Sequence, residues 1–272
     1  MLQLRIDEEK CIQCGECADD CPRNVLSLDA GYPAVDPEGE EKCIACQHCF
    51  AICPTGALSI FGLDPEDSYS LDDALPSPQQ LTMLMKGRRS VRRYLEAPVK
   101  SSVITEIIEI VANGPTGVNN RQLLFTVIES QSTMTTLRKD TIEGIRKVTK
   151  QGSLSEGLEL FAGIVDAADD GKDILFRNAP HLLIVSSPAD GASPEQDCLI
   201  ALTYFELLAA ASGLGTVWNG LCNWALTRIV PELLEQLDIP ENHTIGYMMS
   251  FGKPAVEYHR TVQRGGARIN TL

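Results

Sequence analysis

Hydrophobic residues recur with helical spacing after residue 80. A first helix is predicted to begin at Leu81, where the run Leu81-Thr82-Met83-Leu84-Met85 leads into a basic cluster. A second helix is predicted after Pro98, because its apolar residues lie three or four positions apart: Val103, Ile104, Ile107, Ile108 and Val111. The sequence Asn113-Gly114-Pro115 then signals a helix end.

Three later apolar runs have the length of strands: residues 123–128, 181–187 and 244–251. The run Leu182-Leu183-Ile184-Val185 favours a strand that is buried on both faces. A long apolar helix is predicted over about residues 196–212, ending at Gly213. These elements predict an α+β domain with helices on both sides of a central sheet. Residues 130–178 look helical and polar, and their elements stay open.

Eight of the ten cysteines follow one pattern near the start of the chain. The spacing C-x2-C-x2-C-x3-C occurs twice, each time followed by proline, and the second copy lies 32 residues after the first. This spacing is typical of bacterial proteins with two [4Fe–4S] clusters, in which the fourth cysteine of each motif binds the other cluster. We therefore predict one cluster on Cys11, Cys14, Cys17 and Cys53, and a second on Cys43, Cys46, Cys49 and Cys21.

The repeat extends beyond the ligands, so two related halves are expected to pack around the clusters. A segment of about 60 residues has little core of its own, and the clusters would act as staples. Structural zinc usually pairs two C-x2-C knuckles across a longer gap, which does not fit three evenly spaced cysteines. A disulfide framework is not expected either, because the chain opens without a secretory signal, and we expect a cytoplasmic protein. His48 is interpreted as an exposed or supporting residue, since cysteines fill the ligand count.

Charge is unevenly distributed along the 272 residues, whose net charge is −14. Residues 1–80 carry four basic and sixteen acidic residues, a net of −12, and the rest carries 19 and 21, a net of −2. The acidity argues against nucleic acid as a partner and suits either solubility or the steering of a basic redox partner. No apolar run is long enough to span a membrane. The predicted layout is a two-cluster domain over 1–61, an acidic linker over 62–80 and a second domain over 81–272.

Arginines gather at the start of the second domain, in Gly87-Arg88-Arg89-Ser90-Val91-Arg92-Arg93-Tyr94. The planar guanidinium group suits phosphate because it donates two parallel hydrogen bonds. By itself the cluster is open to three interpretations: a phosphate site, a solvated charged face, or a docking patch for the acidic end of the chain.

Residues 81–272 resemble the nitroreductase family of FMN-dependent oxidoreductases. The resemblance rests on the arginine motif, on Pro115-Thr116-Gly117-Val118-Asn119-Asn120-Arg121, and on the stretch Gly213 to Gly220 that contains Trp218. It implies a mostly antiparallel sheet flanked by helices and a ferredoxin–nitroreductase fusion, with the predicted helix 196–212 at a homodimer interface. The implied cofactor-binding residues are Arg88, Arg89, Ser90, Arg92, Pro115, Thr116, Gly117, Asn119, Arg121, Trp218, Asn219, Gly220, Arg260 and Arg264.

The resemblance also implies roles for these residues. Arg88, Arg89 and Ser90 would hold the FMN phosphate, completed by Arg264 or Arg260, and Arg92 would reach the ribityl chain or ring. Thr116 and Asn119 would contact the flavin from the partner subunit, and backbone amides of Asn219 and Gly220 would face N5 and O4. Arg121 departs from the usual glutamine, which leaves the substrate pocket open. Cys198 and Cys222 are expected to be buried thiols.

The predicted function is electron transfer from the two [4Fe–4S] clusters to FMN and on to an electron-poor acceptor such as a nitroaromatic or quinone. The family requires no catalytic side-chain base, since the flavin carries the chemistry. Reduced ferredoxin or NAD(P)H would supply the electrons. Two alternatives stay open: another flavin reduction, such as dehalogenation or ene reduction, and a redox sensor or electron shuttle with bound FMN.

Overall fold

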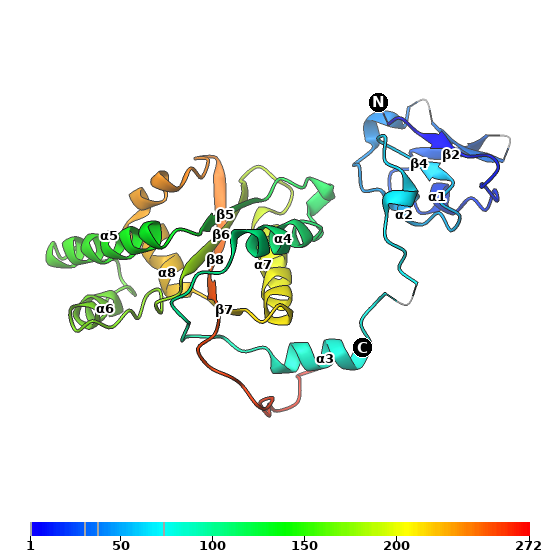
Figure 1. The fold of residues 1–272 in the computed structure, drawn as a ribbon. Coiled ribbons are helices and arrows are strands. Elements are labelled where there is room, and N and C mark those ends of the chain that lie inside the picture. The colour runs from blue at the N-terminus through cyan, green and yellow to red at the C-terminus, as the bar shows by residue number, and fades with distance from the viewer. Residues whose placement is uncertain (1, 30, 37, 73) are drawn as a thin grey trace. The chain divides into compact units, whose positions relative to one another are not determined.

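The computed structural model describes residues 2–29, 31–36, 38–72 and 74–272. The chain divides into two compact units, Met1–Pro76 and Ser77–Leu272 (Figure 1). Each unit has its own buried core. The boundary falls within the predicted linker. No helix in the described residues is long and apolar enough to cross a membrane.

The N-terminal unit is built from short elements that follow the sequence repeat. Strand β1 (Arg5–Ile6) pairs antiparallel with β4 (Leu58–Ser59), and β2 (Leu26–Asp29) pairs with β3 (Tyr32–Val35). Helices α1 (Glu16–Asp19) and α2 (His48–Ala51) occupy equivalent places, 32 residues apart, in the two halves. Turns of 3₁₀ helix lie at Glu40–Lys42 and Pro65–Asp67.

The core of this unit is small. The buried members of this core in the described residues are Leu2, Cys17, Val25, Leu26, Leu58 and Ile60. Most of the other cysteines pack against this core as partly buried residues. So few buried side chains stabilise a fold of this size only weakly, which fits the predicted dependence on bound clusters.

A four-stranded antiparallel sheet forms the centre of the C-terminal unit, in the order β5-β6-β8-β7. Its strands are β5 (Leu124–Ile128), β6 (His181–Pro188), β7 (Gly215–Trp218) and β8 (His243–Gly252). Because successive side chains of a strand point to opposite faces, Leu182 and Ile184 enter one core and Leu183 and Val185 the other. Burial on both faces explains the unbroken apolar run of β6.

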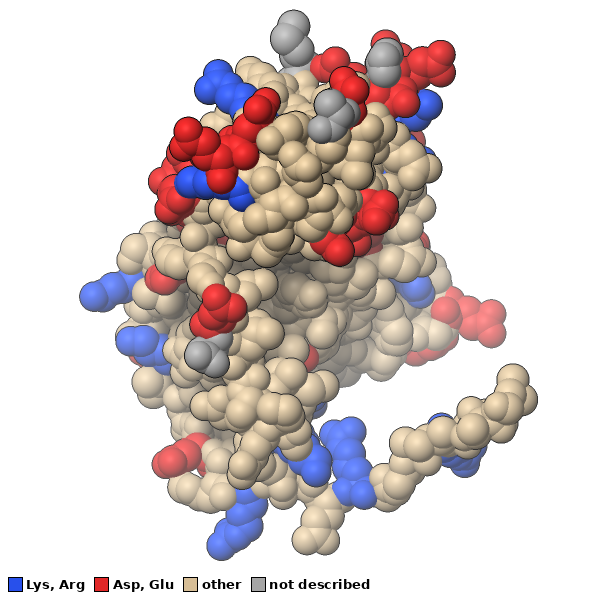
Figure 2. Space-filling view, turned by 90° about the vertical axis from the view of Figure 1, so that its right-hand side faces the viewer, with Lys and Arg blue, Asp and Glu red and all other residues tan. Residues whose placement is uncertain are grey.

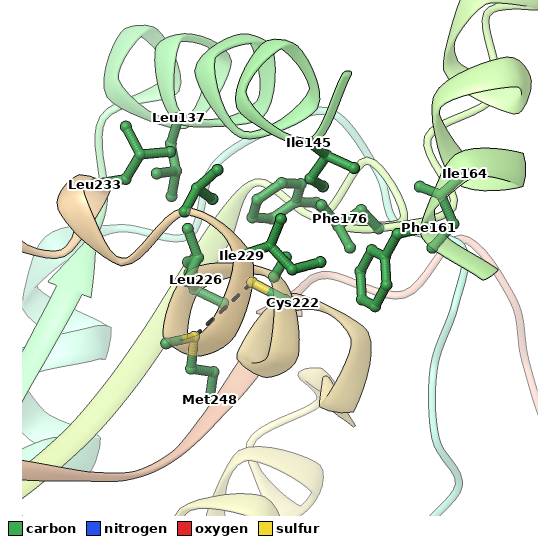
Figure 3. Packing of buried hydrophobic residues seen from close by; sticks show 14 of the residues in the cluster. Leu137, Ile145, Phe161, Ile164, Phe176, Cys222, Leu226, Ile229, Leu233 and Met248 are labelled. Carbon is green, nitrogen blue, oxygen red and sulfur yellow. Dashed lines mark hydrogen bonds between the residues drawn. The ribbon is translucent and has the colours of Figure 1, made fainter. Parts of the chain in front are cut away.

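Helices cover both faces of this sheet (Figure 1). One face packs against α5 (Gln131–Lys150), α6 (Leu160–Asp169), α8 (Gly220–Trp224) and the π-helical turn Ala225–Ile229. Figure 3 shows this core, with Phe161, Phe176 and Leu226 among its buried residues. The other face packs against α4 (Ser101–Val111) and α7 (Pro194–Ala211), and α3 (Pro78–Gly87) lies beside α7. Short 3₁₀ turns occur at Gly117–Asn119, Pro231–Leu233 and Glu235–Leu237.

The predicted α+β class with an antiparallel sheet between helices is confirmed. Two features differ from the prediction. The helix expected from Leu81 begins at Pro78, because Ser77 and Gln80 form a reciprocal capping box at its start. The stretch Gly213 to Gly220 is not among the predicted strands, but its residues Gly215–Trp218 form edge strand β7.

Candidate functional site

The eight motif cysteines lie around two cavities in the N-terminal unit. Cys21, Cys43, Cys46 and Cys49 line one, which holds about 400 Å³, including space open to solvent. Cys11, Cys14, Cys17 and Cys53 line the other, of about 380 Å³. These are the two groups that the sequence spacing predicts. In the described residues all ten cysteines are free thiols, and no three His, Cys, Asp or Glu side chains are placed to hold a single metal ion.

Backbone amides donate hydrogen bonds to several of these sulfurs. The Val25 amide donates to Cys21 Sγ at 3.3 Å, and the Ala57 amide donates to Cys53 Sγ at 3.2 Å. The two bonds are equivalent in the 32-residue repeat. The Ala45 amide donates to Cys43 Sγ at 3.4 Å. Donors at thiolate sulfur are a common means of tuning iron–sulfur clusters.

The thiols differ in how easily they ionise without a bound metal. Burial raises the pKa of Cys17, and raises that of Cys49 to about 11. Burial also acts to raise the pKa of Cys53, but hydrogen bonds from Thr55, Ala57 and Leu58 outweigh it, so this pKa is lowered. Around the cysteines the unit is acidic, and Figure 2 shows carboxylate side chains crowded over it on the face drawn.

In the C-terminal unit, the arginine motif is joined to the sheet. Ser90 forms a parallel bridge with Thr216 of β7, and the Val91 amide donates to the Thr216 carbonyl at 2.8 Å. Val91 can approach β7 this closely only because residue 215 is glycine, since a Cβ there would lie 2.6 Å from Val91 Cγ2. The motif is therefore held at a defined place along strand β7.

Two of its arginines are half-buried. Arg88 Nη1 donates to Glu206 Oε1 of α7 at 2.7 Å, and Glu206 is only 7% exposed. Arg89 Nη2 donates to the Lys86 carbonyl at 3.0 Å, whereas its buried Nε has no protein partner within the described residues. Arg92 is exposed, and its guanidinium donates to the Ser90 carbonyl at 3.5 Å.

Arg88 and Arg89 line a cavity with Lys86 and Arg264, together with Met85 and residues of the C-terminal tail. It holds about 1060 Å³, including space open to solvent. The structure thus brings Arg264, one of the two predicted tail arginines, to the motif. Arg260 is exposed and does not line this cavity. Four cations around one hollow with an unpaired Nε suit a phosphate group.

Residues 115–121, the second motif of the predicted flavin site, pack against the start of α7. The Gly117 amide donates to Asp197 Oδ1 at 2.9 Å, and the Arg121 amide donates to Thr116 Oγ1 at 3.1 Å. Val118, Asn119 and Arg121 all have positive φ, which defines a tight turn. Pro115 and Arg121 are exposed, and Thr116, Gly117 and Asn119 are half-buried.

In the third motif of the predicted flavin site, Gly213 to Gly220, the structure differs from the expectation for the Asn219 amide. Asn219 is buried, its amide donates to the Met248 carbonyl at 3.0 Å, and its side chain bonds Leu175, Ser250 and Cys222. The sheet thus uses the amide that was expected to face a flavin, and Asn219 instead caps α8. Trp218 packs on Tyr247 with ring centroids 5.5 Å apart. Gly220 begins α8, and a Cβ there would lie 2.8 Å from the Tyr247 hydroxyl.

Two supporting residues were not predicted as part of the site: Glu206 and Asp197. Both are carboxylates inside the apolar run that forms α7, and that placement was the available signal. The two isolated cysteines are buried as expected, and Cys222 lies 3.9 Å from the sulfur of Met248 (Figure 3). His48 is exposed and lies 3.2 Å from an oxygen of Asp20.

Comparison with known proteins places this geometry in a family. A family model described as the nitroreductase family matches residues 85–253. The chain belongs to the nitroreductase family. A second model, described as a 4Fe-4S dicluster domain, matches residues 4–60, so this nitroreductase-family chain carries a dicluster domain at its N-terminal side. The predicted fusion and the predicted oxidoreductase class are confirmed.

Named relatives of the nitroreductase unit are distant in sequence. A protein of Methanothermobacter thermautotrophicus, whose name proposes an NADH dehydrogenase or NAD(P)H nitroreductase, is 26% identical over 184 residues, covering 67% of this chain and 82% of that protein. A Bacteroides fragilis nitroreductase solved with bound FMN is 22% identical, with a TM-score of 0.57, covering 71% of this chain and 99% of that one. An FMN-bound nitroreductase of Desulfitobacterium hafniense is 17% identical, with a TM-score of 0.56, covering 72% and 100%. These structures share the fold.

Proposed function

We propose that this protein is a flavin-dependent oxidoreductase that passes electrons from two [4Fe–4S] clusters to FMN and on to an electron-poor acceptor, such as a nitroaromatic or quinone. The observation that carries the proposal is the presence, in one chain, of two four-cysteine cavities and a cationic cavity on a nitroreductase fold. Covalent linkage of donor and acceptor units raises the effective concentration of one at the other.

The eight motif cysteines would bind the two clusters, four thiolates to each, in the groups that line the cavities. Each bound cluster carries one electron at a time. The protein's part is to hold the thiolates, to donate amide hydrogen bonds to their sulfurs, and to exclude water with the small core beside Cys17.

FMN would bind along strand β7. Arg88, Arg89 and Arg264, which line the cavity, would hold its phosphate together with the adjacent Ser90, and the phosphate would satisfy the Arg89 Nε. Thr216, which bridges to Ser90, lies two residues before Trp218, the last residue of β7, a span of about 7 Å at ~3.3 Å per residue. Trp218 and Gly220, the first residue of α8, would then lie beside the ring of an extended flavin. Bound FMN supplies the chemistry, because it accepts single electrons and delivers them in pairs.

The remaining predicted residues would surround the flavin. Arg92 lies two residues after Ser90, where a cation would stabilise negative charge on the pyrimidine edge of a reduced ring. Thr116 and Asn119 would contact the flavin from a partner subunit, supported by Asp197 behind the loop. Pro115, Gly117 and Arg121 would shape the same wall. The Gly220 amide would keep its predicted role beside the flavin, whereas the sheet occupies the Asn219 amide.

The protein is proposed to be a homodimer. Apolar side chains remain exposed on α3, on α4 and on α7: Leu81, Met83, Met85, Ile110, Leu199 and Tyr204. Several exposed apolar residues on neighbouring helices are typical of an interaction surface. Sedimentation at micromolar concentration should therefore give twice the chain mass. A small-molecule acceptor, reduced ferredoxin or NAD(P)H as donor, and a cytoplasmic location complete the proposal.

The deciding experiment is an anaerobic redox titration of the whole protein, followed by visible and EPR spectra. We expect about eight irons and roughly one FMN per chain, with both cofactor types exchanging electrons. Two zinc ions without acid-labile sulfide would overturn the cluster assignment. Replacing Arg88 and Ser90 by Ala should release FMN and leave the iron content unchanged.

A second experiment tests the path. Cys11→Ala should block reduction of the flavin by reduced ferredoxin and spare any direct reduction by NAD(P)H. Equal loss of both would mean that the clusters only support the fold.

A further inference from the structure

In each cavity one cysteine comes from the other half of the repeat: Cys53 in one and Cys21 in the other. The two cavities differ in a hydroxyl contact to this cysteine. Cys53 and Cys21 are equivalent in the repeat, and each accepts an amide hydrogen bond from the residue four positions later. Cys53 Sγ also lies 3.8 Å from the Thr55 hydroxyl, within hydrogen-bond range for sulfur. The residue equivalent to Thr55 in the first half is Arg23, which has no hydroxyl group.

We propose that the Thr55 hydroxyl donates to the Cys53 sulfur and raises the reduction potential of the cluster that Cys53 helps to bind, leaving the other cluster unaffected. This inference rests on the proposed function, because it requires that [4Fe–4S] clusters occupy the two cavities. It deepens that function by assigning a tuning residue to one of the two electron carriers.

The physical argument concerns charge. Reduction adds one negative charge to a cluster, and part of it spreads onto the ligand sulfurs. A donor at a sulfur is therefore attracted more strongly to the reduced form, and the equilibrium shifts toward reduction. Within the described residues the Thr55 hydroxyl has no other hydrogen-bond partner, so its proton is available to Cys53.

Local geometry keeps the hydroxyl in place. Pro54 separates Cys53 from Thr55, and its ring restricts φ, so the short connection cannot swing freely. The Ala57 amide donates to the same sulfur at 3.2 Å. Thr55 is exposed, so water competes for the hydroxyl and the effect is expected to be moderate.

The second cavity is tuned by different means. Arg23 and His48 line it, and no side-chain hydroxyl contacts Cys21 in the described part of the chain. A cation acts through solvent over a longer range, whereas the hydroxyl acts at one sulfur. Removing the hydroxyl should therefore change one potential and not both, whichever cluster has the higher potential in the wild type.

The test is an anaerobic potentiometric titration of the full-length protein, read by EPR. Thr55→Val removes the hydroxyl at constant shape, and Thr55→Ser keeps it as the matched control. We expect Thr55→Val to lower the reduction equilibrium constant of one cluster by roughly three- to tenfold, where tenfold is about 59 mV for one electron. Thr55→Ser should titrate like the wild type. Cys53→Ser, which alters the EPR signal of one cluster, identifies which component must move.

Three results would overturn the inference: both potentials unchanged in Thr55→Val, both shifted equally, or the same shift in Thr55→Ser. Each requires iron content equal to wild type. The proposed function fails differently, since a wild-type protein without [4Fe–4S] signals would refute it before any variant is compared.

Discussion

Arg88 Nη1 donates to Glu206 Oε1 at 2.7 Å, which anchors the first arginine of the basic motif to the interior of helix α7. The side chains of the pair are 24% and 9% exposed, so water screens the interaction only in part. Leaving a carboxylate at this depth without its guanidinium partner is costly, because few water molecules can replace the lost contact.

Replacing one partner of this pair should therefore lower the free energy of unfolding more than replacing both. Arg88→Met is expected to lower the free energy of unfolding by about 2 kcal/mol, because Glu206 is left without its cation. In a Glu206→Leu background the same substitution should cost clearly less, giving a coupling energy of about 1–2 kcal/mol. Urea unfolding of the four proteins of the cycle measures it, and additive costs would contradict the pairing.

Gly246 is expected to be intolerant of any side chain. A Cβ there would lie 2.0 Å from Cys198 Cβ of α7, at the point where the register of β6 and β8 shifts. Gly246→Ala should therefore destabilise the C-terminal unit by about 3 kcal/mol or more, since helix and strand must separate. Gly163→Ala in α6 is the control, because nothing lies within 4 Å of that Cβ. It should be neutral or stabilising by about 0.5–1 kcal/mol. Similar losses in both variants would contradict this packing.

His181 should make the C-terminal unit sensitive to acid. The buried ring accepts the Val99 amide at Nε2, 2.9 Å away, with Nδ1 3.3 Å from the Ile128 carbonyl, and burial lowers its pKa. The unfolded chain binds this proton near pH 6.5 and the folded chain only at lower pH. Its contribution to stability is thus complete above pH 6.5 and is lost as the pH falls from there toward the folded-state pKa.

Fluorescence can follow this effect separately, since both tryptophans, Trp218 and Trp224, belong to the C-terminal unit. Urea midpoints should fall between pH 6.5 and 5 for wild type and for His259→Gln, whose imidazole is exposed. In His181→Leu the urea midpoint should depend less on pH, although the variant is less stable overall. An unchanged slope in His181→Leu would assign the acid sensitivity to other groups.

Iron removal should unfold one unit and spare the other. The N-terminal core contains few buried residues, whereas strands β6 and β8 are buried between two layers of helices. After treatment with chelator and oxidant, amide protection should disappear over residues 2–60 and persist in β6 and β8. Hydrogen exchange read by mass spectrometry measures this, and protection retained over 2–60 in iron-free protein would refute the stapling role.

The sequence predicted best the elements whose side chains have one dominant environment. Strand β6 carries the unbroken apolar run Leu182–Val185 because both its faces are buried, and α4 shows its buried stripe at Ile104, Ile107 and Val111. Helices α5 and α6 stayed unassigned because the segment that contains them is largely polar. Strand β7 escaped prediction because it has only four residues and begins with glycine.

The candidate sites divide in the same way. Three ligands of each cysteine group follow from their close spacing, and the fourth follows from the crossed pattern that is typical of this repeat. The role of Asn219 could not be read in advance, since the use of its amide depends on the register with Met248, which only the sheet defines. Arg88 was predicted, but its partner Glu206 lies 118 positions away and reveals itself only once α7 is packed.

The bridge between Ser90 and Thr216 bears on the aggregation of the protein at the high concentrations of a cell. Strand β7 lies at the margin of the sheet, and unpaired margins of this kind recruit foreign strands and seed insoluble assemblies. By taking up the Thr216 carbonyl, the Val91 amide closes part of that margin with the motif that we propose binds phosphate. If loss of the cofactor loosened the motif, the hydrogen-bonding groups of β7 would be exposed to other chains. The supply of flavin would then affect the tendency of the protein to aggregate.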